Sequence, residues 1–113
     1  MEILPGKRLQ CNIMIGRTKE GWISVACAQG GVNILEYRSK SDEWIKLNGA
    51  LFPGLKAECS TKFVVSVQQG TVKLLIDGAP VVEASVGNRD MTGPWGLSVQ
   101  AGGAVLWRNL CVE

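Results

Sequence analysis

The sequence has 113 residues, a formal net charge of +2, and no histidine. Its length fits a single domain over residues 1–113 with a hydrophobic core and no room for a second domain. Because the lysines and arginines are spread singly, the charge argues against nucleic-acid binding. The lack of histidine excludes nucleophilic catalysis in its usual histidine-dependent form.

No targeting or membrane segment is visible in the sequence. Residues 1–7 lack an apolar stretch behind a basic start, and no run approaches the ~18 apolar residues of a membrane span. We therefore expect no membrane association. The predicted location is the cytoplasm, unless the chain is a fragment of a longer exported protein.

Alternation of apolar and polar residues predicts strands from the start of the chain. Residues 8–15 place Leu9, Cys11, Ile13 and Ile15 on one face, and a polar loop follows at residues 16–21. Residues 22–28 and 32–38 form a predicted hairpin around a three-residue loop at 29–31. This register pairs Val25 with Leu35 and Ile23 with Tyr37 on the core face. The other face then collects these pairs: Trp22 with Arg38, Ser24 with Glu36, and Ala26 with Ile34.

The middle of the chain is less regular. A charged turn at residues 39–43 and a short strand at 44–47 precede residues 48–61, where Asn48-Gly49 and Phe52-Pro53-Gly54 predict turns and at most one helical turn. Residues 87–94 read as a second irregular segment, an exposed loop.

Two consecutive hairpins are predicted between residues 62 and 85. With Gln69-Gly70 as a two-residue turn, the apolar partners share one face: Phe63 with Ile76, Val65 with Leu74, and Val67 with Val72. A three-residue loop at Asp77-Gly78-Ala79 then sets Val82 opposite Leu74 and Glu83 opposite Lys73.

The last predicted hairpin joins residues 95–100 to 104–112 around residues 101–103, with Val99 opposite Val105 and Leu97 opposite Trp107. Together with 14 glycines and no helical period, these elements predict an all-β protein, an antiparallel sandwich of about nine strands in two sheets.

Three stretches resemble the closing strands of the concanavalin A-like lectin/glucanase jelly rolls: VKLLIDGAPV at residues 72–81, GPWGL at 93–97 and VLWRNLCV at 105–112. Within that superfamily, the stretches resemble most the group of keto-disaccharide hydrolase-like and laminin G-like domains. Trp107 stands where that family usually has phenylalanine, and the resemblance implies a core position for it. Full domains of this family are larger. The resemblance therefore implies a trimmed domain, a fragment, or a protomer covered by a partner, and it is more specific for fold than for function.

The four cysteines, Cys11, Cys27, Cys59 and Cys111, are widely separated and have no paired zinc spacing. Free thiols in a reducing compartment are the simpler interpretation. Since the first and last strands of jelly rolls commonly pair, a disulfide between Cys11 and Cys111 is the alternative.

The carboxylates do not form a catalytic pair. The glucanase branch of the resembled fold carries its acids on one face of one strand, whereas Glu36, Glu58, Asp77 and Glu83 occur singly here and Asp77 is a turn residue. We expect no enzymatic activity and no cofactor. Asn88 with Asp90 is the one weak candidate for a calcium site, and these two residues are better explained as polar side chains of a solvent-exposed loop.

The predicted ligand-binding residues are Trp22, Glu36, Arg38 and Trp44. An aromatic ring beside carboxylate and guanidinium groups is the composition of a sugar-binding face. The first hypothesis is therefore a non-catalytic, lectin-like module for an oligosaccharide. The alternative is a structural or assembly protein in which the Trp22 face or an edge strand is buried in a homodimer, and a degenerate hydrolase ranks third.

Overall fold

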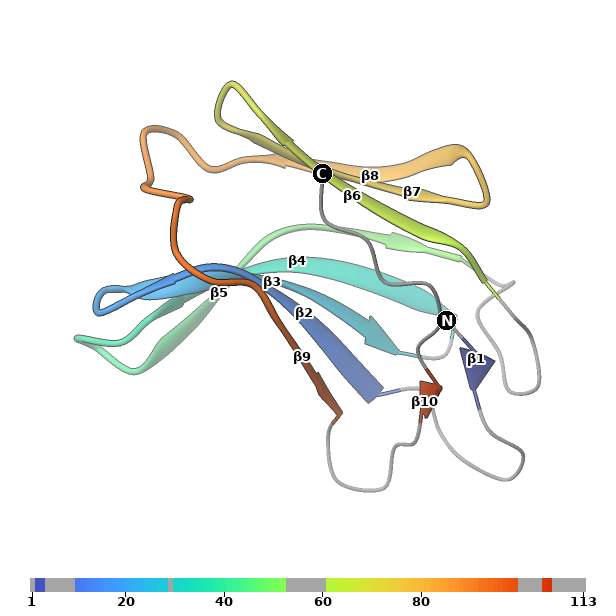
Figure 1. Ribbon diagram of the computed structural model, residues 1–113, viewed down its shortest axis with the longest axis horizontal. Helices are drawn as coiled ribbons and strands as arrows, with labels where there is room; N and C mark the ends of the chain where they lie inside the picture. The colour runs from blue at the N-terminus through green and yellow to red at the C-terminus, as the bar shows by residue number, and fades with distance from the viewer. Residues whose placement is uncertain (1, 4–9, 29, 53–60, 100–104, 107–113) are drawn as a thin grey trace.

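The computed structural model describes residues 2–3, 10–28, 30–52, 61–99 and 105–106 (Figure 1). Its described part is all-β, as predicted, and every strand pair is antiparallel. The strands are β1 (Glu2–Ile3), β2 (Gln10–Thr18), β3 (Gly21–Ala28), β4 (Gly31–Arg38), β5 (Glu43–Leu51), β6 (Phe63–Gln68), β7 (Thr71–Ile76), β8 (Ala79–Ser85), β9 (Gly96–Val99) and β10 (Val105–Leu106). They form sheets ordered β5-β4-β3-β2-β9, β6-β7-β8 and β1-β10.

The five-stranded and three-stranded sheets lie face to face, one above the other in Figure 1. Strand alternation turns every second side chain into the space between them. The buried side chains of the core come from both sheets: Ile13, Ile15, Ile23, Val25, Cys27, Val32 and Ile34 from the larger, and Val72, Leu74, Ile76, Val82 and Ala84 from the smaller. The arrangement is thus β-sandwich-like.

The hairpins of the smaller sheet follow from their turn residues. Gln69 and Gly70 adopt φ of 49° and 74°, so the two-residue turn and all the predicted β6–β7 pairs are confirmed. The β7–β8 turn also has two residues, Asp77 and Gly78, at φ of 50° and 85°. It is one residue shorter than predicted, but a bulge at Val81 restores the predicted pairing of Leu74 with Val82.

The predicted register of β3 and β4 is wrong by one residue. Ala28 pairs with Gly31, so Trp22 lies opposite Tyr37 and Ile23 lies opposite Glu36. Because successive side chains point to opposite faces, a shift of one residue exchanges the faces of the whole of β4. The observed register buries Val32 and Ile34 in the core and turns Leu35 and Tyr37 outward.

Two other strands run further than predicted. Strand β2 continues to Thr18, which leaves only Lys19 and Glu20 in the turn to β3. Strand β5 continues past Asn48 and Gly49 to Leu51 through a bulge at Leu47, so Asn48-Gly49 is not a turn. The helical turn considered for residues 48–61 falls mostly on residues 53–60, outside the described part.

In the last predicted hairpin, the pairing of Val99 with Val105 is also wrong. Strand β9 pairs with β2, where Leu97 lies opposite Ile13, and the backbone of Val105 pairs with that of Ile3. Neither pairing can be predicted from local sequence, because β2–β9 and β1–β10 each join a strand near the start of the chain to one near its end. Trp107 and Cys111 lie outside the described residues.

Residues 87–94 form no strand, as predicted, but the loop is not simply exposed. It crosses from β8 in one sheet to β9 in the other (Figure 1), and Met91 packs against the core. A Cβ added at Gly93 would lie 2.0 Å from the carbonyl oxygen of Arg17. The loop therefore closes tightly over the end of β2, where only glycine fits.

Candidate functional site

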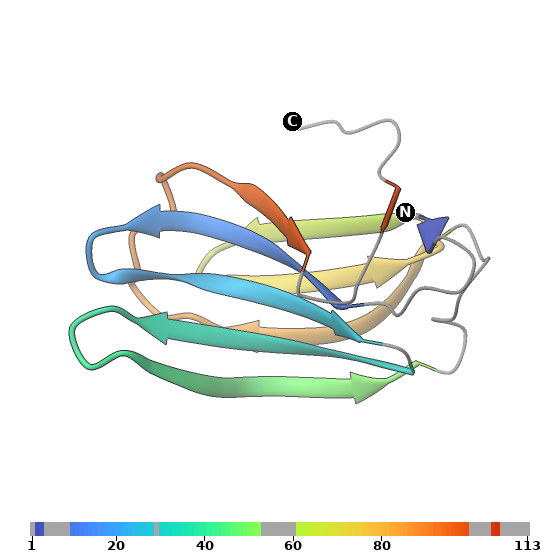
Figure 2. The same cartoon turned by 90° about the horizontal axis from the view of Figure 1, so that it is seen from below.

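An aromatic cluster of Trp22, Tyr37 and Trp44 lies on the outer face of the five-stranded sheet. The three residues occupy adjacent strands β3, β4 and β5 at the same level, because Tyr37 pairs with both tryptophans. Ring centroids are 4.5 Å apart for Trp22–Tyr37, 4.8 Å for Tyr37–Trp44 and 6.1 Å for Trp22–Trp44. Figure 2 shows the strands of this sheet side by side. The rings contact one another in tilted and edge-on geometries, which stabilise aromatic pairs.

The three rings differ in how much surface they offer. Trp44 is 52% exposed, whereas Trp22 is half-buried and its indole Nε1 is buried without a hydrogen-bond partner. The Tyr37 hydroxyl donates to Oδ1 of Asp42 at 2.7 Å. This bond to a carboxylate raises the pKa of Tyr37 above its usual value, with smaller contributions from desolvation and from the charge of Asp42. Trp44 is therefore the ring most available to a ligand.

A hollow of about 100 Å³ adjoins the cluster, and we call it the Arg17 hollow. It is lined by Met14, Arg17, Pro94, Trp95 and Gly96. The Arg17 guanidinium carbon lies 5.5 Å from the centroid of the Trp22 ring, a cation–π geometry. Trp95 is 41% exposed here, at the start of β9. The sequence analysis placed Arg17 in a loop and Trp95 at the start of a strand paired with residues 104–112, since nothing local indicates that β9 lies beside β2.

Polar side chains continue along the same outer face. The Ser24 hydroxyl donates to Oδ1 of Asn12 at 3.0 Å, and Nδ2 of Asn12 lies 3.5 Å from the Ser98 hydroxyl. Further along the sheet, the amide oxygen of Asn33 covers Gly49, whose added Cβ would lie 2.3 Å from it. The partly exposed amides of Asn12 and Asn33 and the hydroxyl of Ser98 thus border the aromatic cluster and can form hydrogen bonds with a ligand, whereas Ser24 is fully buried behind them.

Glu36 and Arg38 do not join Trp22 and Trp44. The observed register turns Glu36 toward the three-stranded sheet, where Oε1 lies 2.5 Å from Nε of Arg38 and Oε2 lies 3.6 Å from Nη1 of Arg89. Nε and Nη2 of Arg89 are buried without hydrogen-bond partners. The four predicted site residues therefore divide into two pairs on opposite faces, and Arg89 was missed because it lies in a loop distant in sequence.

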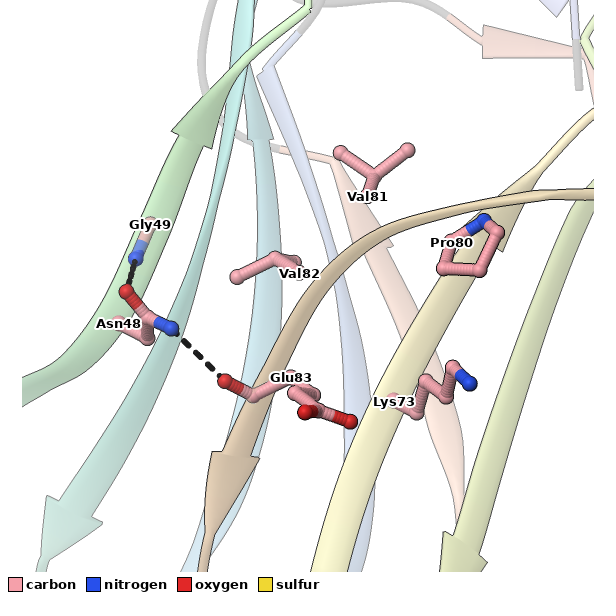
Figure 3. Close-up of a pocket in the computed structure, with 7 residues that line it drawn as sticks. All are labelled: Asn48, Gly49, Lys73, Pro80, Val81, Val82 and Glu83. Atoms are coloured by element: carbon pink, nitrogen blue, oxygen red, sulfur yellow. Dashed lines mark hydrogen bonds between the residues drawn. The ribbon is translucent and has the colours of Figure 1, made fainter.

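A second hollow, about 350 Å³, lies along the edges of the two sheets, where β5 meets β8 (Figure 3). Nδ2 of Asn48 donates to the carbonyl oxygen of Glu83 at 2.8 Å, and Oδ1 accepts from the backbone N–H of Gly49 at 2.8 Å. Its lining residues are Asn48, Gly49, Lys73, Pro80, Val81, Val82 and Glu83. Asn48 is engaged in joining the sheets and the lining contains no aromatic ring, so the aromatic cluster is the better ligand site despite its smaller hollow.

The described residues contain no group of three or more histidine, cysteine, aspartate or glutamate side chains that could hold a metal ion. Asp90, the calcium candidate, accepts from both the hydroxyl and the backbone N–H of Thr92, at 2.6 and 2.9 Å. These bonds hold the pKa of Asp90 below its usual value, the hydroxyl contributing most. The described part of the chain also contains no helix, and so none that could span a membrane.

Comparisons of the chain with protein-family models, with curated proteins and with solved structures find no match.

Proposed function

We propose that this chain is a non-catalytic module that binds a carbohydrate on the outer face of its five-stranded sheet. The observation that carries the proposal is the cluster of three contacting rings, with Trp44 half exposed at its edge. The proposed contact residues are Trp22, Tyr37 and Trp44. Glu36 and Arg38 are not included, because they face the other sheet.

Physical chemistry supports a sugar as the ligand. The apolar face of a pyranose packs on an aromatic ring, and its hydroxyls bond to nearby amides and hydroxyls. The outer face offers both kinds of group: Asn12, Asn33 and Ser98 are partly exposed there, while the fully buried Ser24 hydroxyl donates to Asn12 and holds its amide in place. None of the described strand positions that face outward on this sheet carries a carboxylate, which favours binding over glycoside hydrolysis.

We also propose that the fold is a small concanavalin-like jelly roll, as the resemblance of residues 72–81 and 93–97 implies. Two features support it: two antiparallel sheets share one core, and the early strand β2 pairs with the late strand β9. A late strand entering the sheet beside an early one is a feature of Greek-key sandwiches.

The test is calorimetric titration of the chain with a panel of neutral and acidic oligosaccharides. Trp44→Ala should weaken binding about tenfold or more while the fold persists, because Trp44 is exposed. The matched control is Leu51→Ala, which removes another exposed apolar side chain (88% exposed) from the same strand and face. Absence of binding to every glycan, or equal effects of the two substitutions, would overturn the proposal.

Assembly through the same face is the second candidate, since Trp44 and Leu51 both expose apolar surface there. Native mass by light scattering separates the two functions. A dimer that Trp44→Ala dissociates would assign this face to a second copy of the chain. A monomer whose tryptophan fluorescence responds to a sugar would favour the binding module.

A further inference from the structure

The outer face of the five-stranded sheet carries a local excess of positive charge. Arg17 and Lys46 lie on this face, and neither forms an ion pair within the described residues. The acid close to the cluster, Asp42, accepts a hydrogen bond from the Tyr37 hydroxyl and sets one negative charge against these two positive charges. The chain as a whole is almost balanced, with 12 basic and 10 acidic residues. The excess is therefore a property of this face, and it is complementary to an anionic ligand.

The backbone of Arg17 is held in place from two sides. Its N–H donates to the carbonyl oxygen of Pro94 at 3.0 Å, and Gly93 packs against its carbonyl oxygen. The guanidinium is placed over the Trp22 ring. A guanidinium above a ring still has in-plane N–H groups to offer, and these match the two oxygens of a carboxylate. The side chain is thus partly ordered before a ligand arrives, which reduces the entropic cost of binding.

The size of the Arg17 hollow limits what enters it. At about 100 Å³ it has room for a small substituent rather than a whole sugar ring. Trp95, 41% exposed in the same wall, can support the ring that carries the substituent. A sugar whose carboxylate points into the hollow could pair with the Arg17 guanidinium while its ring packs on Trp95.

We infer that the glycan bound by this face is acidic, with a uronate carboxylate held by Arg17 in the hollow beside Trp95. This inference rests on the proposed carbohydrate-binding function and extends it to a ligand class.

The experiment compares oligomers of galacturonate, glucuronate and mannuronate with their methyl esters by calorimetry at low salt. Each ester keeps the sugar, removes the negative charge and adds one methyl group, and the response of Arg17→Gln separates the effect of the charge from the bulk of that methyl group. We expect at least one free acid to bind about tenfold or more tightly than its ester, as for a charge-assisted bidentate contact. Arg17→Gln should remove most of that difference, because it should weaken binding of the free acid much more than binding of the ester. The control Lys73→Gln removes the same charge from the smaller sheet and should preserve the difference.

The outcomes separate this inference from the function on which it rests. Equal affinity for acid and ester, with binding still dependent on Trp44, would overturn the uronate assignment and leave the carbohydrate module standing. Tighter binding of a sulfated oligosaccharide than of any uronate would also overturn it. Failure of every acidic, esterified and neutral glycan to bind would overturn both. A thermal midpoint unchanged by Arg17→Gln shows that the variant is folded.

Discussion

Trp22 and Tyr37 lie directly opposite one another on β3 and β4, with ring centroids 4.5 Å apart. This pair fixes which side of the five-stranded sheet is aromatic and which is apolar, because Ile23 and Glu36, the next pair along, must then point inward. The same pair brings Trp44 into the cluster, since Tyr37 is also its cross-strand partner on β5.

Truncating Trp22 should cost much more stability than truncating Trp44. Trp22 is half-buried and touches both other rings, so we expect Trp22→Ala to lower the free energy of unfolding by about 2–3 kcal/mol. Trp44→Ala should cost about 1 kcal/mol, mainly from lost aromatic pairing. Urea denaturation followed by far-ultraviolet circular dichroism measures both. The lower expected cost at Trp44 makes it, rather than Trp22, the residue for testing binding. Equal costs would contradict the difference in burial between the two rings.

The Glu36–Arg89 pair should behave as a buried ion pair. Both side chains are only about one-sixth exposed, at 15% and 16%. Glu36→Ala leaves the Arg89 guanidinium buried without its carboxylate and should destabilise the fold by about 3 kcal/mol. Arg38→Ala removes the other, 56% exposed partner of Glu36 and should cost less than about 1 kcal/mol. A double variant, Glu36→Leu with Arg89→Met, should recover most of the loss. Failure to recover it would mean that the arginine has a role beyond neutralising Glu36.

The close approach at Gly93 predicts a strong response to a single methyl group. Gly93→Ala would place a Cβ 2.0 Å from the Arg17 carbonyl oxygen, so the loop must shift and the Arg17–Pro94 backbone bond must break. We expect a loss of about 2–3 kcal/mol in unfolding free energy. Gly78→Ala is the comparison: it has open space around its Cβ and only the cost of positive φ, about 1 kcal/mol. A smaller effect at Gly93 than at Gly78 would contradict the tight closure of the loop over β2.

The single tyrosine gives a direct titration. Tyr37 donates to Asp42, which raises the pKa of the phenol in the folded state. Its contribution to stability is therefore present below the unfolded pKa of about 10 and is lost as pH rises through the higher folded value. Asp42→Asn keeps a residue that tolerates the φ of 53° but removes the charge, so the pKa of Tyr37 should fall toward its usual value. Phenolate absorbance against pH measures this directly, with Asp90→Asn as a control that should leave the pKa of Tyr37 unchanged.

The all-β class and the two hairpins of the smaller sheet were predictable from the sequence alone. Alternation from Phe63 to Ile76 placed every apolar residue on one face, and Gln69-Gly70 supplied the positive φ values of a two-residue turn, so only one register satisfied both. For β7 and β8, the predicted loop was one residue longer than the observed one. The predicted pairing of Leu74 with Val82 was still correct, because the bulge at Val81 compensates for the difference.

The register of β4 and the pairing of β9 depend on contacts between segments that are far apart in the sequence. Strand β4 has apolar residues on both faces, Val32 and Ile34 on one and Leu35 and Tyr37 on the other. Packing against the three-stranded sheet selected the face with Val32 and Ile34 for the core. That choice separated Glu36 and Arg38 from Trp22 and Trp44. The pairing of β2 with β9 likewise assembled the Arg17 hollow from segments almost 80 residues apart. A register or a site of this kind depends on which strand faces pack against each other and exclude water. The local alternation of apolar and polar residues does not specify that packing.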